Sequence, residues 1–553
     1  MLQLTALKAD RQSWDAHYKE LQEYFSPRRG RWIDHGKTRD GNKVNQKLID
    51  PTPRFAARTL ASGMHAGSTN PAMPWFKLTT PDPEMLEFPA VAQWLYTVET
   101  LMRGVFERSN LYAILPMLYG DGGVFGTAPM VILEHPQKII HCVPSPVGSY
   151  YLATNSDGKV DTKVCEYEMT VQQVVQKFGI DAVSNFVRDA YNNGKFQQWV
   201  KLLHVIEPNK GRQYGVYDNK NMEFRSVYLE MQNAEQKILK QSGFEDNPLA
   251  ALRWETTEIT DAYGSSPGMD ALGCAKAMQV QQKRKAQAID KHIDPPMVGD
   301  SALQNQPSTL LPGGVTYAGF TANGSAPKFQ PAYLLKPELG GIMEDIQDIR
   351  SLVQTAMYTD LFLAITLADP RQATVPEIIE RREEKILMLG PVLQNHRDGL
   401  IKPLIDRTFY VMMRQGMLPP PPPELEGVEL KVELVGLLAQ ALKAVASGGI
   451  ERFSGFIGTL AKMQADSGME PSILDKIDID QTVDEYAQAI GVPPTMVRGD
   501  DDVAQIRADR AEARQAEQQA AAAQPIKDGA LAAKTLSETP VGGTNALEAL
   551  VGA

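Results

Sequence analysis

The chain has 553 residues and a formal net charge of −11, with 43% hydrophobic and 22% charged residues. This length is enough for several structural units with sizeable cores, and the composition is ordinary for a water-soluble protein. The acidic balance argues against a protein built for tight nonspecific DNA binding, which usually carries a basic excess, but it is compatible with loose DNA contact.

The start of the chain, its apolar runs and its cysteines indicate the cellular compartment in which the protein works. No apolar run approaches the length that crosses a bilayer, and the start, MLQLTALKADRQSWD, lacks a basic segment and a small-residue cleavage site. We therefore expect neither a membrane partner nor a secretion signal. The cysteines Cys142, Cys165 and Cys274 are odd in number and scattered, which predicts a reducing compartment and thiols buried as small apolar groups.

The first half of the chain combines helices with a sheet. Apolar residues at helical spacing predict helices over 3–25 and 86–107. From about residue 130 to 255 the pattern predicts an antiparallel sheet, with a hairpin turn at the Asn-Ser-Asp-Gly of 155–158. Thr170 and Gln173 form a capping-box pattern that predicts a short helix within this sheet region, ended by Gly179.

The second half is mainly helical, so the predicted fold class is α+β. Helices are predicted over 268–292 and about 337–358, with a segment rich in proline, glycine and short β-like runs between them. Thr374 and Glu377 predict the start of a long helix. Pro391 and Pro403 are expected to kink that helix, and Gly416 with the prolines of 419–423 to end it.

The last part of the chain has weaker signals. Several short helices are predicted within 434–490. Residues 501–524 strongly favour a helix but have almost no apolar face. The final residues are low in complexity.

The stretch Tyr-Gly-Ser-Ser-Pro-Gly matches the Gly-x-Ser-x-Gly pattern of a hydrolase nucleophile at Ser266. In that motif the backbone N–H after the serine forms half of the oxyanion hole. Here the next residue is Pro267, which has no N–H. We therefore predict a structural turn in which Ser265 or Ser266 caps the next helix and Pro267 lies in its first turn.

Other enzyme-like signals are equally weak. The glycine-rich segment 120–129 lacks the Lys-Ser/Thr ending of a phosphate loop, so we interpret it as a turn leading into a strand. His135, His141, Cys142 and Cys165 share a region without the spacing of a zinc site. We predict no catalytic residue, no cofactor and no metal, and hence a protein that is not an enzyme.

The charges of the predicted helix pair allow two interpretations. In the first helix Lys276, Lys283 and Lys291 recur at helical spacing with Arg284 beside them. The second helix has an apolar stripe and an acidic face, made by Ile342, Ile346, Ile349, Val353 and Ala356 and by Glu338, Glu344, Asp345 and Asp348. The pair is either two packed helices with solvated outer faces, or a pair whose charges meet DNA or a neighbouring subunit. Periodicity alone does not choose between them.

Several segments resemble, in order, the portal (head-to-tail connector) proteins of short-tailed bacteriophages. AYGSSPGMDALGCAKAM is similar to the entry of that family's first stem helix, and LASGMHAGSTNPAMPWFKL to its N-terminal signature. NLYAILPMLYGDGGVFGTAPM, TVPEIIERREEKILMLGPVLQNHRDGLIKPLIDRTFYVMMRQGMLPPPP and DIDQTVDEYAQAIGVPP resemble later segments. The resemblance covers roughly residues 10 to 510, and ordered segments are more specific than one motif.

The resemblance implies a portal fold with wing, stem, clip and crown, assembled as a ring, typically of twelve subunits. The implied boundaries are as follows: wing 1–265, first stem helix 266–293, clip 294–335, second stem helix 336–359, tunnel loop 360–373, wing with a long kinked helix 374–440, crown 441–500, and a barrel-like helical extension with a low-complexity tail 501–553.

The resemblance also implies a function and partners. The ring would lie at one capsid vertex of the virion, after assembly in the host cytoplasm, and pass double-stranded DNA during packaging and ejection without base specificity. Implied partners are the major capsid protein at the wing, the terminase large subunit and then a tail adaptor at the clip, and internal core or ejection proteins at the crown. The residues expected to line the DNA channel are Lys276, Lys283, Arg284, Lys291, Phe362 and Arg371. The alternatives are a pore-less minor capsid or scaffold protein, and a serine hydrolase that uses Ser266.

Overall fold

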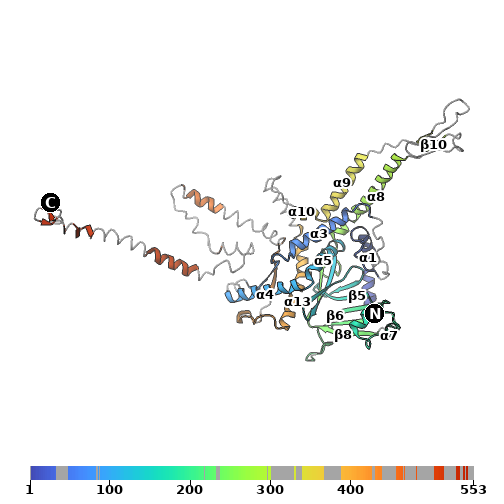
Figure 1. Ribbon diagram of the computed structural model, residues 1–553, viewed down its shortest axis with the longest axis horizontal. Helices are drawn as coiled ribbons and strands as arrows, with labels where there is room; N and C mark the ends of the chain where they lie inside the picture. The colour runs from blue at the N-terminus through green and yellow to red at the C-terminus, as the bar shows by residue number, and fades with distance from the viewer. Residues whose placement is uncertain are drawn as a thin grey trace. The chain divides into compact units, whose positions relative to one another are not determined.

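The structure is a computed structural model. Apart from isolated residues, it describes 2–32, 48–82, 88–216, 218–231, 237–294, 297–299, 329–331, 339–366, 388–425, 430–436, 456–464 and 503–515. The chain divides into two compact units, one made of Met1–Leu86 with Gln93–Ala446 and the other of Glu87–Ala92 with Ser447–Ala553. Figure 1 shows the elements with the labels used below.

Helices and strands are both abundant. The helices between residues 2 and 414 are α1 Leu2–Tyr24, α3 Thr52–Ser68, α4 Pro89–Arg108, α5 Leu111–Phe125, α6 Val171–Phe178, α7 Asn185–Asn192, α8 Pro267–Ile293, α9 Leu339–Ala356, α10 Thr359–Thr366, α12 Gly390–His396 and α13 Lys402–Arg414, with a π-helical segment η3 at Arg397–Ile401. The strands up to residue 434 are β1 Phe76–Thr79, β2 Thr127–His135, β3 Ile139–Pro144, β4 Tyr150–Thr154, β5 Val160–Thr170, β6 Trp199–Pro208, β7 Phe224–Glu230, β8 Ile238–Phe244, β9 Leu249–Arg253, β10 Met297–Gly299, β11 Phe329–Pro331 and β12 Lys431–Leu434. The mixed helix and strand class predicted from the sequence is confirmed.

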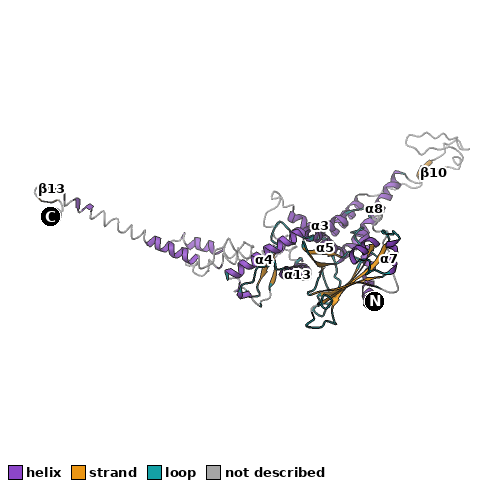
Figure 2. Cartoon of the chain, turned by 60° about the horizontal axis from the view of Figure 1, so that its bottom comes forward, coloured by secondary structure: helices purple, strands orange, loops and turns teal. Residues whose placement is uncertain are grey.

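Two antiparallel sheets occupy the predicted strand-rich region (Figure 2, strands in orange). One has five strands in the order β4-β5-β6-β7-β8 and the other has three in the order β3-β2-β9. The predicted hairpin joins β4 to β5, and its turn contains Gly158 at a φ of +74°, a conformation that glycine adopts without strain. The predicted antiparallel sheet is therefore present, but it is divided into two.

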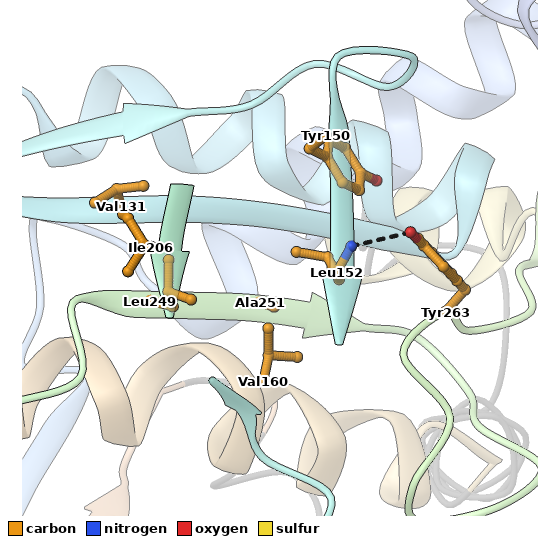
Figure 3. Packing of buried hydrophobic residues seen from close by; sticks show 8 residues of the cluster. All are labelled: Val131, Tyr150, Leu152, Val160, Ile206, Leu249, Ala251 and Tyr263. Atoms are coloured by element: carbon orange, nitrogen blue, oxygen red, sulfur yellow. Dashed lines mark hydrogen bonds between the residues drawn. The ribbon is translucent and has the colours of Figure 1, made fainter. Parts of the chain in front are cut away.

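The core of this region lies between the sheets. Val131 of β2 and Ala251 of β9 pack against Tyr150, Leu152 and other side chains of the five-stranded sheet. Figure 3 shows this cluster, in which the Leu152 N–H donates to Tyr263 Oη at 3.0 Å. On the other face of the five-stranded sheet, α1 packs its leucines against β4, β5 and β6. Both faces of the sheet are thus covered.

The short helix α6 begins as predicted. Thr170 Oγ1 accepts from Gln173 N and the Gln173 side chain accepts from Thr170 N, which completes the capping box. Gly179 ends the helix at a φ of +87°. Valines of α6 and α7 then pack on β6, so this predicted interruption forms a small helical layer on the sheet.

The glycine-rich segment 120–129 differs from the prediction of a turn, because α5 continues through it to Phe125. Gly122 and Gly123 let neighbouring helix and strand side chains approach closely: a Cβ would lie 2.5 Å from Leu252 Cδ2 at the first and 2.5 Å from Leu60 Cδ2 at the second. The turn is confined to Gly126 (φ +76°), and β2 follows directly. These glycines therefore serve close packing of a buried helix.

The predicted long helix is described from residue 388 on, and its predicted cap at Thr374 and Glu377 lies outside the described residues. Pro391 and Pro403 each lie in the first turn of a helix, α12 and α13, with the π-helical η3 between them. The helix is continuous from Gly390 to Arg414, and the π-helical η3 directly precedes α13, where the missing N–H of Pro403 leaves one α-helical hydrogen bond unmade. Gly416 follows the end of α13 at a φ of +66°, as predicted.

In the second unit, residues 456–464 and 503–515 are helical, and the side chains of 503–515 are almost all exposed. The apolar-poor helix predicted there is confirmed over those residues. No helix in the described parts of the chain is long and apolar enough to span a membrane. The three cysteines carry free thiols, of which Cys142 is buried and Cys165 and Cys274 are half-buried, so their predicted burial is only partly confirmed.

Candidate DNA interface

The predicted helix pair forms an antiparallel hairpin. In Figure 1 α8 and α9 lie side by side, and the antiparallel pair β10–β11 lies on the chain between them. The predicted apolar stripe of α9 faces inward, with Ile346 and Val353 buried and Ile342 and Ile349 half-buried. Glu344, which belongs to the predicted acidic face of α9, is exposed. The two helices are thus packed along their apolar sides, which leaves charged side chains on the outside.

Asp50 fixes the base of this hairpin. Its Oδ2 accepts hydrogen bonds from Arg350 Nε and Nη2, at 3.0 and 2.9 Å, and from Gln282 Nε2 at 2.9 Å. Its Oδ1 accepts from the N–H and hydroxyl of Thr52, at 2.9 and 2.6 Å. Burial of this carboxyl opposes ionisation, but the hydrogen bonds from Thr52, Arg350 and Gln282 outweigh it and lower the pKa of Asp50 below its ordinary value.

Gln279 completes the anchor. Its amide oxygen accepts from the backbone N–H groups of Ile49 and Asp50, at 2.7 and 2.8 Å, and its amide nitrogen donates to Asp50 O at 3.0 Å. Sequence reasoning missed this anchor. Gln279 and Gln282 are three residues apart on one helix face, beside the buried Met278, and polar residues at such positions are the signal that could have indicated a buried polar contact.

Ser266 begins α8 as its N-cap. Its side chain accepts a hydrogen bond from Met269 N at 3.2 Å, and its hydroxyl donates to Val124 O at 2.8 Å. The residue is 2% exposed, and Pro267 occupies the first turn. The predicted structural turn is confirmed. A buried hydroxyl whose proton is held by a carbonyl cannot reach a substrate, which argues against the hydrolase alternative.

The predicted channel cations of α8 do not share one environment. Lys276 Nζ forms an ion pair with Glu20 of α1 at 2.6 Å. Its charge is therefore already partnered within the chain. Lys283, Arg284 and Lys291 are exposed. Arg284 and Lys291 are seven residues apart and therefore share a face of the helix, with Lys283 next to it. The candidate interface consequently comprises Lys283, Arg284 and Lys291.

The prediction for Phe362 needs a correction. The segment expected to be a loop over 360–373 begins within the helix α10, Thr359–Thr366, in which Leu361 and Phe362 are buried. Phe362 is 3% exposed and packs on α3, where a Cβ at Gly63 would lie 2.2 Å from Phe362 Cγ. A ring held in this contact is a core residue, so the structure removes Phe362 from the candidate interface. Arg371 lies outside the described residues.

The described residues contain no cluster of three or more His, Cys, Asp and Glu side chains that could hold a metal ion. The serine of the hydrolase-like motif is a helix cap. The α8/α9 hairpin is anchored at its base by Asp50 and carries exposed charged side chains on its outside.

Comparison with known proteins identifies the family. Residues 2–497 match the bacteriophage head to tail connecting protein family. The chain is 44% identical to the portal protein of Salmonella phage epsilon15 over 552 residues, which cover 100% of this chain and 97% of that relative. It is 39% identical to a probable portal protein of Bordetella phage BPP-1, over 98% of this chain and 95% of the relative. The chain belongs to the bacteriophage head-to-tail connector family, in which the resemblance had placed it.

The chain was also compared with solved structures, and the similarities are weak. A chain in the neck of an empty gene transfer agent particle is 10% identical with a TM-score of 0.32, over 78% of this chain and 95% of that chain. A chain of the native gene transfer agent virion is similar at the same identity and TM-score, over 76% and 91%. Similarity at this level carries no argument about the present chain.

Proposed function

We propose that twelve copies of this chain form a ring at one vertex of the capsid, and that double-stranded DNA enters and leaves the head through its channel. The observation that carries the proposal is the 44% identity to a phage portal protein along the whole chain. Membership of the head-to-tail connector family supports the same conclusion. The protein is a structural component of the head-to-tail junction rather than an enzyme.

The parts of the ring are proposed from the described elements. The helices α8 and α9 would form the stem, and the segment that carries β10 and β11 would form the clip. The remaining assignments are wing for 1–265 and 374–440, tunnel loop for 360–373, crown for 441–500, and a helical extension with its tail for 501–553. The anchored base of the α8/α9 hairpin supports this scheme, because a stem must pass load between the clip and the wing.

The basic residues of α8 are compatible with a channel through which DNA moves. Lys283, Arg284 and Lys291 would be repeated around the channel axis, while the exposed acids of α9 reduce the net positive charge. Contacts between lysine or arginine and phosphate give affinity without base specificity, and that affinity falls steeply with salt. A few such contacts per subunit would guide a duplex without halting it.

The partners follow from the same scheme. The terminase large subunit, and later a tail adaptor, would dock at the clip, the major capsid protein at the wing, and internal core or ejection proteins at the crown. The exposed helix 503–515 supports a role for the C-terminal part between subunits. A helix with few apolar contacts of its own gains stability from pairing with identical neighbours, through charges such as Arg510 and Glu512.

The alternatives are not favoured. A pore-less capsid or scaffold protein does not account for similarity to portal proteins along the whole chain. A hydrolase does not account for the buried, capping Ser266.

The test is an image of the purified full-length chain in negative stain. A perforated ring supports the proposal. A compact particle without a pore, at concentrations where light scattering shows a stable oligomer, would overturn it.

A further inference from the structure

A pocket of about 620 Å³ lies beside the five-stranded sheet, between β5, β6 and β7 and the strands β2 and β3. Side chains from both sheets line it, among them Val131, Leu133, Lys163, Tyr167 and His204. The volume is in the range of pockets that hold small organic ligands, roughly 300 to 1,000 Å³. The pocket is separate from the α8/α9 hairpin and has no part in the proposed DNA channel.

Lys163 is the unusual residue of this pocket. It lies on β5 opposite Ile206 of β6 and is only 3% exposed. Its ammonium group makes no hydrogen bond or ion pair with the part of the chain that the structure describes. Burial lowers the pKa of Lys163 below its ordinary value. The side chain is largely removed from water and lines the pocket, so its ammonium is costly without a partner there, and a bound anion would reduce that cost.

Lys177 and the ring of His204 lie beside one aromatic ring at the same pocket. His204 stacks on Tyr228 with ring centroids 3.9 Å apart, and Lys177 Nζ lies 4.7 Å from the centroid of the same Tyr228 ring. Burial lowers the pKa of His204 well below its ordinary value, and the charges of Lys163 and Lys177 lower it further. Both lysines therefore create a positive potential where His204 borders the pocket.

A second polar group also lacks a partner. Tyr167 Oη is buried and has no hydrogen-bond partner within the described chain. Tyr167 and Lys163 are four residues apart on β5, so their side chains leave the same face of the strand, about 13 Å from each other along it. A ligand between them would find two donors, one at each end.

The acidic residues at the rim of the pocket already have basic neighbours. Glu166 pairs with Lys8 at 2.6 Å. Glu168 stands directly opposite Lys201 in the β5–β6 register, where opposite charges attract. Both glutamates also leave the opposite face of β5 from Lys163, which makes them poor counterions for its ammonium group.

We propose that this pocket binds a small organic anion, with its carboxylate or phosphate on Lys163 and its apolar body against Val131, Leu133 and Leu202. The Tyr167 hydroxyl would donate to a second acceptor of the ligand. The apolar walls select an organic molecule over an inorganic ion, and the unpaired ammonium selects a negative charge.

The test uses 8-anilino-1-naphthalenesulfonate as the probe, because it is an aromatic anion that fluoresces in apolar sites. The expected result is a saturable fluorescence rise with the full-length protein, weakened about tenfold by Lys163→Met and restored by Lys163→Arg. Lys276→Met, which removes a lysine outside the pocket, should leave the binding unchanged. Displacement by 1-naphthoate or by 1-naphthyl phosphate, but not by neutral 1-naphthalenemethanol, would identify the head group that Lys163 prefers.

Cys165 reports where the probe binds. It borders the pocket between Lys163 and Tyr167 on the same strand face. In a Cys274→Ser protein, saturating probe should slow the reaction of Cys165 with N-ethylmaleimide several-fold, measured by peptide mass. This measurement stands even if Lys163→Met does not fold. No saturable binding, equal binding by a folded Lys163→Met protein, or no protection of Cys165 would overturn the proposal.

Discussion

Arg350 on α9 donates two hydrogen bonds to one oxygen of Asp50, at 3.0 and 2.9 Å, across 300 residues of sequence. Gln282 of α8 donates to the same oxygen. One carboxylate therefore joins both helices of the hairpin to the segment that precedes α3.

Replacing Asp50 should loosen the base of the hairpin. Asp50→Ala leaves Arg350 and Gln282 without their shared acceptor, so we expect a loss of about 2–4 kcal/mol in the free energy of unfolding. Hydrogen exchange should become faster at the base of α8 and α9. Asp345→Ala is the control, because Asp345 is exposed and binds only Gln281 among the contacts described. Equal exchange in both variants would contradict the anchoring role.

Ser266→Ala tests the cap of α8. Loss of the hydrogen bond to Met269 N should cost about 1 kcal/mol of stability, while DNA packaging should continue because the serine has no chemical role. Thermal unfolding and counts of DNA-filled heads measure the two effects. Ser265→Ala, at the half-buried neighbour whose hydroxyl makes only a long 3.4 Å hydrogen bond to Glu255 O, should change both less. A packaging defect with unchanged stability would refute this interpretation.

Gly126→Ala should prevent folding. The residue has a φ of +76°, and a Cβ there would lie 1.9 Å from Gly264 O, a backbone atom that cannot move aside. We expect little soluble protein, or a loss of more than about 3 kcal/mol. Gly416→Ala is the matched control, with a φ of +66° and nothing within 4 Å, and should cost only about 1–2 kcal/mol from backbone strain. Similar yields and melting temperatures for the two variants would be the contrary result.

Glu99 should make stability depend on pH. Burial raises the pKa of Glu99 to about 7, although the Leu78 N–H, Lys77 and Arg103 favour the carboxylate. The folded state therefore holds this proton more tightly than the unfolded state. The resulting stabilisation is complete below about pH 4.5 and is lost as the pH rises through 7.

Glu99→Gln removes this titration. The amide can still accept from Leu78 N, which lies 2.7 Å from Glu99 Oε1, so the variant should be more stable than wild type by about 2 kcal/mol at pH 8. The difference should shrink toward pH 5. Melting temperatures at both pH values measure it, with Glu107→Gln on the exposed side of α4 as the control. If the stability difference between Glu99→Gln and wild type is the same at pH 5 and pH 8, Glu99 does not cause the pH dependence of stability.

Lys283→Ala with Arg284→Ala tests the candidate DNA interface. Both residues are exposed, so rings should still assemble. Each lost phosphate contact lowers the salt dependence of DNA affinity by about 0.9 in the log–log slope. We therefore expect fewer DNA-filled heads, with a larger deficit at low than at moderate salt, because the wild-type contacts that the variant lacks are themselves weakened by salt.

Lys276→Ala is the comparison, since its charge pairs with Glu20 and its loss should affect the contact of α1 with α8 instead. Failure of the double variant to assemble before DNA is present would assign Lys283 and Arg284 to subunit packing.

Local sequence determined much of this protein. The spacing of apolar residues predicted α1, α8 and α9, and the inward stripe through Ile346 and Val353 followed from the same period. Pro267 alone was enough to turn a hydrolase-like motif into a helix start, because the missing N–H is a property of the residue itself. Thr170 with Gln173 and Gly158 likewise defined a cap and a turn, since these depend on atoms a few residues apart. The ordered resemblance to portal proteins determined the family.

Tertiary structure decided the features that join distant segments. Phe362 and Leu361 lie in a short apolar stretch that fits a loop or a helix equally well, and only the surface of α3 at Gly63 places the ring in the core. The glycines of 120–125 are compatible with a turn until Leu60 and Leu252 pack against them in a helix. Asp50 anchors the hairpin only because folding brings Arg350 to it. Lys163 is a candidate anion-binding residue only because a pocket lies beside it. Such contacts depend on which atoms folding brings within a few ångströms, and no local pattern contains that information.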